Sequence, residues 1–157
     1  MSEGLIDADI RKAETLPSEF YTDEQHFSKQ MERLSDSLQF VGHSSEFTSD
    51  LTPIPHLESI LKQPLLRTNH DSEKHLLSNV CTHRGMLLCQ EKKNGKSIQC
   101  PYHGRTFDRD GTLKHMPGFE NVENFPSASD NLPSLKLKEW FAYSEASATA
   151  SDPDIMS

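Results

Sequence analysis

The sequence lacks several features that would place the chain in common functional classes. It has 157 residues, a formal net charge of −8 and no run rich in Lys and Arg, so the electrostatic basis for binding nucleic acid is missing. No apolar stretch is long enough to span a bilayer, and the N-terminus is polar and acidic, so we expect neither a membrane span nor a signal peptide. The chain has only three cysteines, which predicts no disulfide framework and a reducing, cytoplasmic location.

Two short motifs, each containing Cys and His and each ending in Gly, are the most informative part of the sequence. CTHRG spans residues 81–85, and CPYHG spans residues 100–104. Two thiolates and two imidazoles, one of each from each motif, can hold a [2Fe-2S] cluster with two Cys on one iron and two His on the other. The candidate metal ligands are Cys81, His83, Cys100 and His103.

Together, CTHRG and CPYHG resemble the Rieske iron–sulfur signature. The resemblance implies one [2Fe-2S] cluster as the cofactor, with Cys81, His83, Cys100 and His103 as its ligands. The stretch before the motifs, LPSEFYTDEQHFSKQMERLSDSLQFVGHSSEF, resembles the start of the large subunit of aromatic-ring-hydroxylating oxygenases. In that family a helix leads into the first strand of the Rieske domain.

A structural zinc site is the alternative use for mixed Cys and His ligands. Zinc ribbons and fingers usually separate their first two ligands by two to four residues. Only one residue separates Cys81 from His83, so the spacing favours the iron–sulfur interpretation over zinc.

The motifs also depart from those of high-potential Rieske proteins. Those proteins carry an extra Cys in each loop, and the two form a disulfide; here Met86 and Tyr102 occupy these positions, and Cys89 has no partner. Arg105 and Phe107 stand where a Ser and a Tyr would donate hydrogen bonds to the cluster. Fewer donors stabilise the reduced cluster less, so we expect a reduction potential near the bottom of the Rieske range, about −150 mV.

Periodicity predicts one helix and a series of strands. Thr22 as N-cap, followed by Phe27, Met31 and Leu34 at helical spacing, predicts a helix over residues 23–35 with an apolar stripe packed on the core. Strands are expected at 38–43, 64–68, 74–80, 97–99, 106–108, 112–114 and, as a single closing strand, 133–143. Turns are expected at 69–73, at Asn94-Gly95 and at 109–111.

These elements predict a mainly β fold. We expect a Rieske-type antiparallel β-sandwich with the ligand loops at one tip and one N-terminal helix. The expected divisions are an N-terminal arm and helix (1–37), the Rieske domain (38–143) and a disordered tail (144–157). The segment from His115 to Phe125 is expected either to fold over the cluster as a lid or to pack as an ordinary loop.

His70 and His75 form an H-x4-H pattern, the spacing that oxygenases use for two ligands of their mononuclear iron. We assign them no such role, because they straddle a predicted hairpin turn and precede the Rieske motifs. The better interpretation is a solvated turn and strand end.

The function implied by the resemblance is electron transfer. The chain would be the Rieske part of a ring-hydroxylating oxygenase large subunit, taking electrons from a reductase or ferredoxin and passing them to a mononuclear-iron oxygenase centre. These 157 residues contain no complete catalytic site, so we expect an oxidoreductase component without activity of its own. The alternatives are a free-standing Rieske-type ferredoxin that serves a separate oxygenase, and a zinc-stabilised interaction module.

Overall fold

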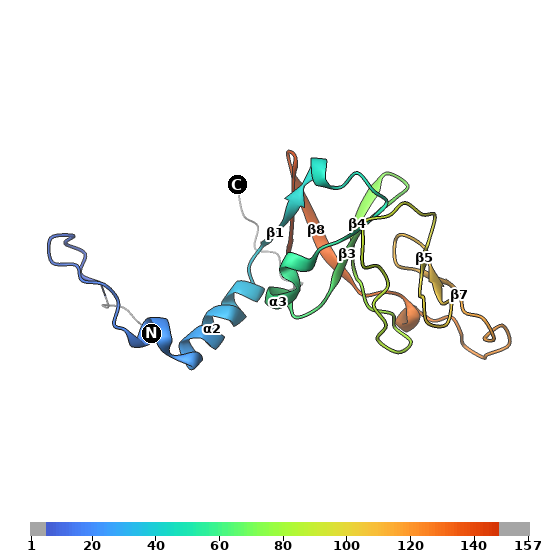
Figure 1. Cartoon of the computed structure of the whole chain (residues 1–157), viewed down its shortest axis with the longest axis horizontal. Helices are drawn as coiled ribbons and strands as arrows, with labels where there is room; N and C mark the ends of the chain where they lie inside the picture. The colour runs from blue at the N-terminus through green and yellow to red at the C-terminus, as the bar shows by residue number, and fades with distance from the viewer. Residues whose placement is uncertain (1–5, 148–157) are drawn as a thin grey trace. The chain divides into compact units, whose positions relative to one another are not determined.

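The computed structural model describes residues 6–147 of the protein (Figure 1). The chain divides into two units after Leu34. The first unit contains a short helix, α1 (Glu19–Thr22), and all but the last residue of α2 (Glu24–Ser35). The predicted helix is therefore confirmed, and so is the mainly β character of the rest of the chain.

Two details predicted for α2 are wrong. The carboxylate of Asp23 accepts a hydrogen bond from the backbone N–H of His26 at 2.9 Å, whereas the hydroxyl of Thr22 donates backwards to the carbonyl of Ser18. Asp23 therefore caps the helix, because Thr22 already ends α1. No residue of α2 is buried, and the side chain of Phe27 is 61% exposed, so the apolar stripe does not pack into a core.

The second unit is built from two antiparallel sheets. A six-stranded sheet has the order β1-β9-β8-β4-β3-β2, and a three-stranded sheet has the order β5-β6-β7. In Figure 1 the small sheet lies at the opposite end of this unit from β1. The strands are β1 (Gln39–His43), β2 (Leu51–Pro53), β3 (Leu65–His70), β4 (Glu73–Ser78), β5 (Ile98–Gln99), β6 (Thr106–Phe107), β7 (Leu113–His115), β8 (Ser134–Trp140) and β9 (Tyr143–Ser147).

The β3–β4 hairpin is buried on both faces and separates two apolar clusters. Leu66 and Leu77 face a cluster that reaches the small sheet, while Leu65 and Leu76 face a second cluster with β1 and α3 (Glu58–Leu61). Neighbouring residues of a strand point to opposite faces, which explains why consecutive leucines serve different clusters. Burying each leucine contributes about 1.5–3 kcal/mol. The hairpin therefore lies between the two clusters, and the cysteines of both ligand loops pack in the first of them.

The turn predicted between these strands is confirmed in a tighter form. The strands are joined through Asp71 and Ser72 alone, both with positive φ, 46° and 70°. The turn at Arg109–Gly111 is also confirmed, with Gly111 at φ 92° between β6 and β7. In both places short polar residues or glycine accept the left-handed conformation that a tight hairpin needs.

The hairpin predicted at Asn94-Gly95 is wrong. No strand flanks these two residues, and neither has a positive φ. Asn94 instead accepts a hydrogen bond from the backbone of Asp50, and the N–H of Gly95 donates to the Asp50 carboxylate at 3.1 Å. A long-range contact with the β1–β2 connection therefore replaces the local turn.

The single closing strand and the start of the predicted tail also need correction. The chain forms two strands here, β8 and β9, joined at Phe141 and Ala142, with Phe141 at φ 52°. Residues 144–147, predicted to be disordered, belong to β9, where Ser144 and Ala146 are buried. The small side chains suit a strand that packs between β1 and β8. The rest of the predicted tail, 148–157, lies outside the described residues.

Among residues 6–147, no helix is both long and apolar enough to cross a membrane.

Candidate metal centre

The first ligand loop is a tight turn closed by two backbone hydrogen bonds. The N–H of Gly85 donates to the carbonyl of Cys81 at 3.0 Å, and the N–H of Cys81 donates to the carbonyl of Met86 at 2.8 Å. Gly85 has φ 69°, a left-handed conformation that glycine adopts without a steric penalty.

The second ligand loop repeats this turn at the same offsets. The N–H of Gly104 donates to the carbonyl of Cys100 at 3.1 Å, and the N–H of Cys100 donates to the carbonyl of Arg105 at 2.8 Å. Gly104 has φ 74°. The backbone conformation therefore explains the glycine at the end of each motif, since both loops need a left-handed residue four positions after the cysteine.

The two loops bring the four predicted ligands into two pairs. Cys81 and Cys100 are 2% and 3% exposed and belong to the same apolar cluster. The imidazoles of His83 and His103 face each other with ring centroids 5.0 Å apart, and both reach solvent. The site therefore has thiols on its inner side and imidazoles on its outer side.

The surroundings shift the protonation of both residue types. Burial raises the pKa of the Cys81 thiol, and the neighbouring Cys100 raises it further. Desolvation lowers the pKa of His83, and the positive charge of Arg84 adds to this. Metal binding needs a thiolate and a neutral imidazole, so the shift at His83 favours the binding form and the shift at Cys81 opposes it. The types of donor are nevertheless those of an iron–sulfur cluster, because two adjacent sulfurs are soft ligands that suit iron and two imidazoles complete the set. The donor set therefore fits a [2Fe-2S] cluster.

The segment predicted as a lid or loop lies beside both motifs. The ring of Phe119 lies 6.4 Å from that of His83, and Phe119 in turn packs against Phe125 at 5.1 Å. Pro117 is the nearest neighbour of Gly104, 3.4 Å from the position of a Cβ there. Phe119 and its neighbours thus cover part of the outer side of the site.

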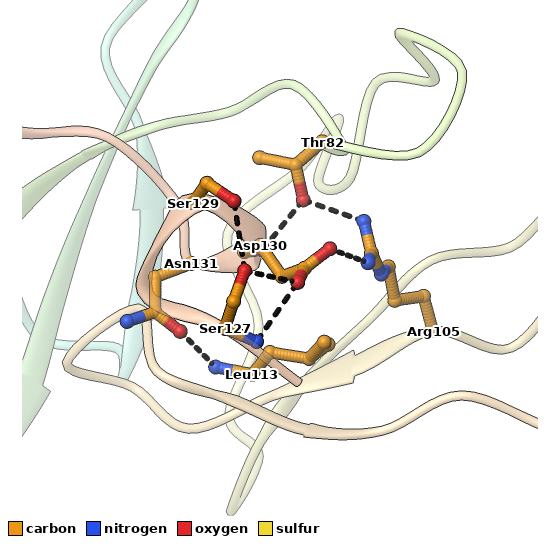
Figure 2. A network of polar contacts seen from close by, with 7 residues as sticks. All are labelled: Thr82, Arg105, Leu113, Ser127, Ser129, Asp130 and Asn131. Carbon is orange, nitrogen blue, oxygen red and sulfur yellow. Dashed lines mark hydrogen bonds and ion pairs between the residues drawn. The ribbon is translucent and has the colours of Figure 1, made fainter. Parts of the chain in front are cut away.

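Sequence reasoning missed a polar network that touches both loops (Figure 2). The buried Arg105 contacts Thr82 of the first loop and pairs with Asp130, a residue in the turn before β8. The Thr and the Arg lie inside or beside the motifs, but Asp130 is 25 residues away from Arg105. Its only local signal is the Ser127–Asp130 capping box, which gives no hint of the partner.

The remaining histidine pair lies elsewhere in the fold. His70 ends β3 and His75 lies in β4, with ring centroids 6.4 Å apart across the hairpin. Across residues 6–147, no three His, Cys, Asp or Glu side chains are grouped so that they could hold one metal ion. This includes the four predicted cluster ligands, which come together as one Cys pair and one His pair.

The cysteines are all free thiols and all buried. Cys89, the cysteine outside the motifs, donates from its thiol to the carbonyl of Glu91 at 3.0 Å.

The family model for the Rieske [2Fe-2S] domain matches residues 37–126, a range that contains both motifs. This chain belongs to that family. A Rieske domain carries one [2Fe-2S] cluster, so the cofactor predicted from the sequence is confirmed at the level of the family.

Sequence relatives are oxygenase subunits. The carnitine monooxygenase oxygenase subunit of Escherichia coli (strain K12) is 36% identical over 138 residues, which cover 87% of this chain and 37% of that protein. The chloroplastic choline monooxygenase of Beta vulgaris is 29% identical over 134 residues, 80% of this chain and 28% of that protein. This Rieske chain thus spans 37% of the length of the first relative and 28% of the length of the second.

Two solved structures of oxygenases also resemble this chain. A quaternary ammonium Rieske monooxygenase in complex with L-carnitine matches with a TM-score of 0.79 and 27% identity over 90% of this chain and 40% of that one. Naphthalene 1,2-dioxygenase from Rhodococcus sp. matches with a TM-score of 0.75 and 22% identity over 88% of this chain and 32% of that one, which shows the shared fold. The recognised Rieske fold of oxygenase large subunits is therefore confirmed.

Proposed function

We propose that Cys81, His83, Cys100 and His103 hold the [2Fe-2S] cluster of this Rieske domain. The two buried thiolates would bind one iron and the two imidazoles the other. The observation that carries this proposal is the shared turn, which places both cysteines in the core and both histidine rings together at the surface. The free state of all three cysteines suits the reducing cytoplasm that we expect for the chain.

The proposed role of the domain is single-electron transfer to an oxygenase. When bound, the cluster supplies a one-electron carrier whose potential lies above that of all-cysteine plant ferredoxins. The histidines serve as the electron port, because their rings form the solvent-facing side of the site. The apolar cluster around the cysteines excludes water from the inner side. Electrons would come from a reductase or ferredoxin and go to a mononuclear iron centre.

The names of the relatives narrow the proposed substrate of that oxygenase. The names of the sequence relatives contain carnitine and choline, and both compounds carry a trimethylammonium group. We therefore propose that the electrons serve oxidation of a quaternary ammonium compound, in place of the aromatic substrate suggested by the resemblance to ring-hydroxylating oxygenases. Similarity to naphthalene dioxygenase, at 22% identity, does not argue against this, since it concerns the fold.

The test is to assay iron, acid-labile sulfide and zinc in the purified chain, after anaerobic reconstitution with iron and sulfide. Two irons and two sulfides per chain, with a paramagnetic signal that appears on reduction, are expected for a Rieske cluster. A redox titration should then give a potential near the low end of the Rieske range, about −150 mV. Stoichiometric zinc in a colourless, redox-silent protein would refute the proposal in favour of a structural zinc module.

A further inference from the structure

A closed ring of polar contacts joins the two ligand loops to the turn before β8 (Figure 2). Arg105 Nη1 donates to Thr82 Oγ1 at 2.8 Å, and Arg105 Nη2 donates to Asp130 Oδ1 at 2.6 Å. The Thr82 hydroxyl in turn donates to the backbone carbonyl of Asp130 at 2.7 Å. Three residues from three separate segments therefore fix one another.

The ring is important because two of its residues lie within or beside the ligand motifs. Thr82 stands between Cys81 and His83, and Arg105 follows the second motif directly. Arg105 also closes the second loop, because its carbonyl accepts the bond from the N–H of Cys100. A movement of the guanidinium would therefore shift both loops together.

Arg105 is buried in this ring, whereas Thr82 and Asp130 are partly exposed. Arg105 is 3% exposed, and its guanidinium lies 5.5 Å from the centroid of the Phe125 ring. Asp130 is held on its other side by Ser127, whose N–H and hydroxyl both donate to Asp130 Oδ2, at 2.9 and 2.8 Å. These donors, led by Ser127, lower the pKa of Asp130, so the pair is ionised at neutral pH. Charge-assisted bonds of this length are stronger than neutral ones.

We propose that Arg105 is a positioning residue that sets the relative placement of the two ligand loops through Thr82 and Asp130, and that the Arg105–Asp130 pair tunes the reduction potential of the site. This inference rests on the proposed function, because it needs the four ligands to hold the cluster. The place is one where high-potential Rieske proteins supply a hydroxyl donor to the cluster. Here the same position supplies a buried positive charge that is balanced by Asp130.

Removing each charge of the pair should shift the midpoint potential in opposite directions. A purely structural role predicts no such opposition. A positive charge near the site favours the reduced state, which carries one more electron, and a negative charge disfavours it. Arg105→Met should therefore move the midpoint potential in the negative direction, and Asp130→Asn in the positive direction. Thr82→Val removes a link without changing charge, so it should speed loss of the cluster several-fold and shift the potential least.

The experiment compares these three variants with the wild-type chain, all reconstituted anaerobically. Iron and sulfide per chain, the rate of iron release to a chelator and the midpoint potential are measured for each. Arg109→Met is the matched control, since Arg109 also pairs with an aspartate at 2.5 Å, but this pair joins the β6–β7 turn to Asp50 in the β1–β2 connection and includes no residue of either ligand loop. It should leave both the release rate and the potential at their wild-type values.

The outcomes separate this inference from the proposed function. Opposite shifts for Asp130→Asn and Arg105→Met, with none for Arg109→Met, support the positioning and tuning role. Equal potentials and equal release rates in all variants overturn it while leaving the ligand assignment intact. If Arg105→Met does not fold, the near-isosteric Asp130→Asn decides the matter by the direction of its shift. A wild-type chain that takes up no iron and sulfide removes both proposals together.

Discussion

The two ligand loops share one backbone turn but use it differently. In each, the glycine four positions after the cysteine donates to the cysteine carbonyl. The histidine, however, is the second residue after Cys81 in the first loop and the third after Cys100 in the second. Two turns with identical bonding thus present their imidazoles from different positions, and the rings meet at 5.0 Å.

The surroundings of the loops differ more than the loops themselves. Met86, which follows the first motif, is exposed, whereas Arg105, which follows the second, is buried in the polar ring. No atom comes within 4 Å of a Cβ built on Gly85, whereas Pro117 lies against Gly104. The local pattern therefore forms each turn, and the distant segments that contact the two turns differ.

The largest expected effect comes from removing a sulfur. Cys81→Ser and Cys100→Ser should each abolish retention of iron and sulfide, because each iron needs its full protein ligand set. Metal and sulfide analysis with visible absorption checks this. Cys89→Ser is the matched control, since its thiol is equally buried but bonds to Glu91 outside the loops, and it should keep the cluster. Full retention in either ligand variant would overturn the assignment.

Exchanging two neighbouring residues of the second loop tests whether the histidine offset matters. The double variant Tyr102→His with His103→Tyr gives both loops their histidine at the same offset from the cysteine. Because the two imidazoles would then no longer converge, we expect most of the cluster to be lost while the fold, measured by circular dichroism, survives. Equal cluster content in variant and wild type would show that the offset is irrelevant.

A smaller effect should follow from adding a methyl group to the loop glycines. Gly85→Ala and Gly104→Ala should each reduce the free energy of unfolding by about 1–2 kcal/mol, the cost of a left-handed conformation. The two costs should be similar, because a Cβ on Gly104 would lie at ordinary van der Waals distance from Pro117 and one on Gly85 would meet no atom within 4 Å. Urea unfolding measures both. Gly95→Ala, at a glycine without a positive φ, is the control and should stay within about 0.5 kcal/mol of wild type.

The smallest effect is a pH dependence of stability that comes from the ring of polar contacts joining the two ligand loops. The pKa of Asp130 is lowered from 3.8, chiefly by hydrogen bonds from Ser127. A lowered folded-state pKa means that the carboxylate stabilises the fold above its unfolded pKa and loses this as pH falls through the folded value. The stability gap between wild type and Asp130→Asn should therefore be constant near neutrality and close below about pH 4.

This gap is best measured by urea unfolding of the chelator-treated chain, so that acid loss of the cluster does not contribute. A gap that widens on acidification would contradict the sign of the shift.

Local chemistry in the sequence predicted much of this molecule. The motif glycines, the Asp110-Gly111 turn and the stripe of α2 are all short-range signals, and each marks a real turn or helix. The failures involve distant partners. Asn94-Gly95 looks like a hairpin turn until Asp50 binds both residues, and Asp130 acquires its role only when Arg105 is folded beside it. Such pairings depend on tertiary packing, which outweighs local propensity.

The pairing of β1 with β9 has a consequence for how the unit can be joined to other segments. Gln39 lies opposite Ala146, so the chain enters and leaves the unit on adjacent strands. Both ligand loops lie on the stretch between, and the small sheet lies at the opposite end from β1 (Figure 1). The two ends of the unit therefore lie side by side, away from the small sheet. Other segments can be attached at these neighbouring ends without passing the two ligand loops.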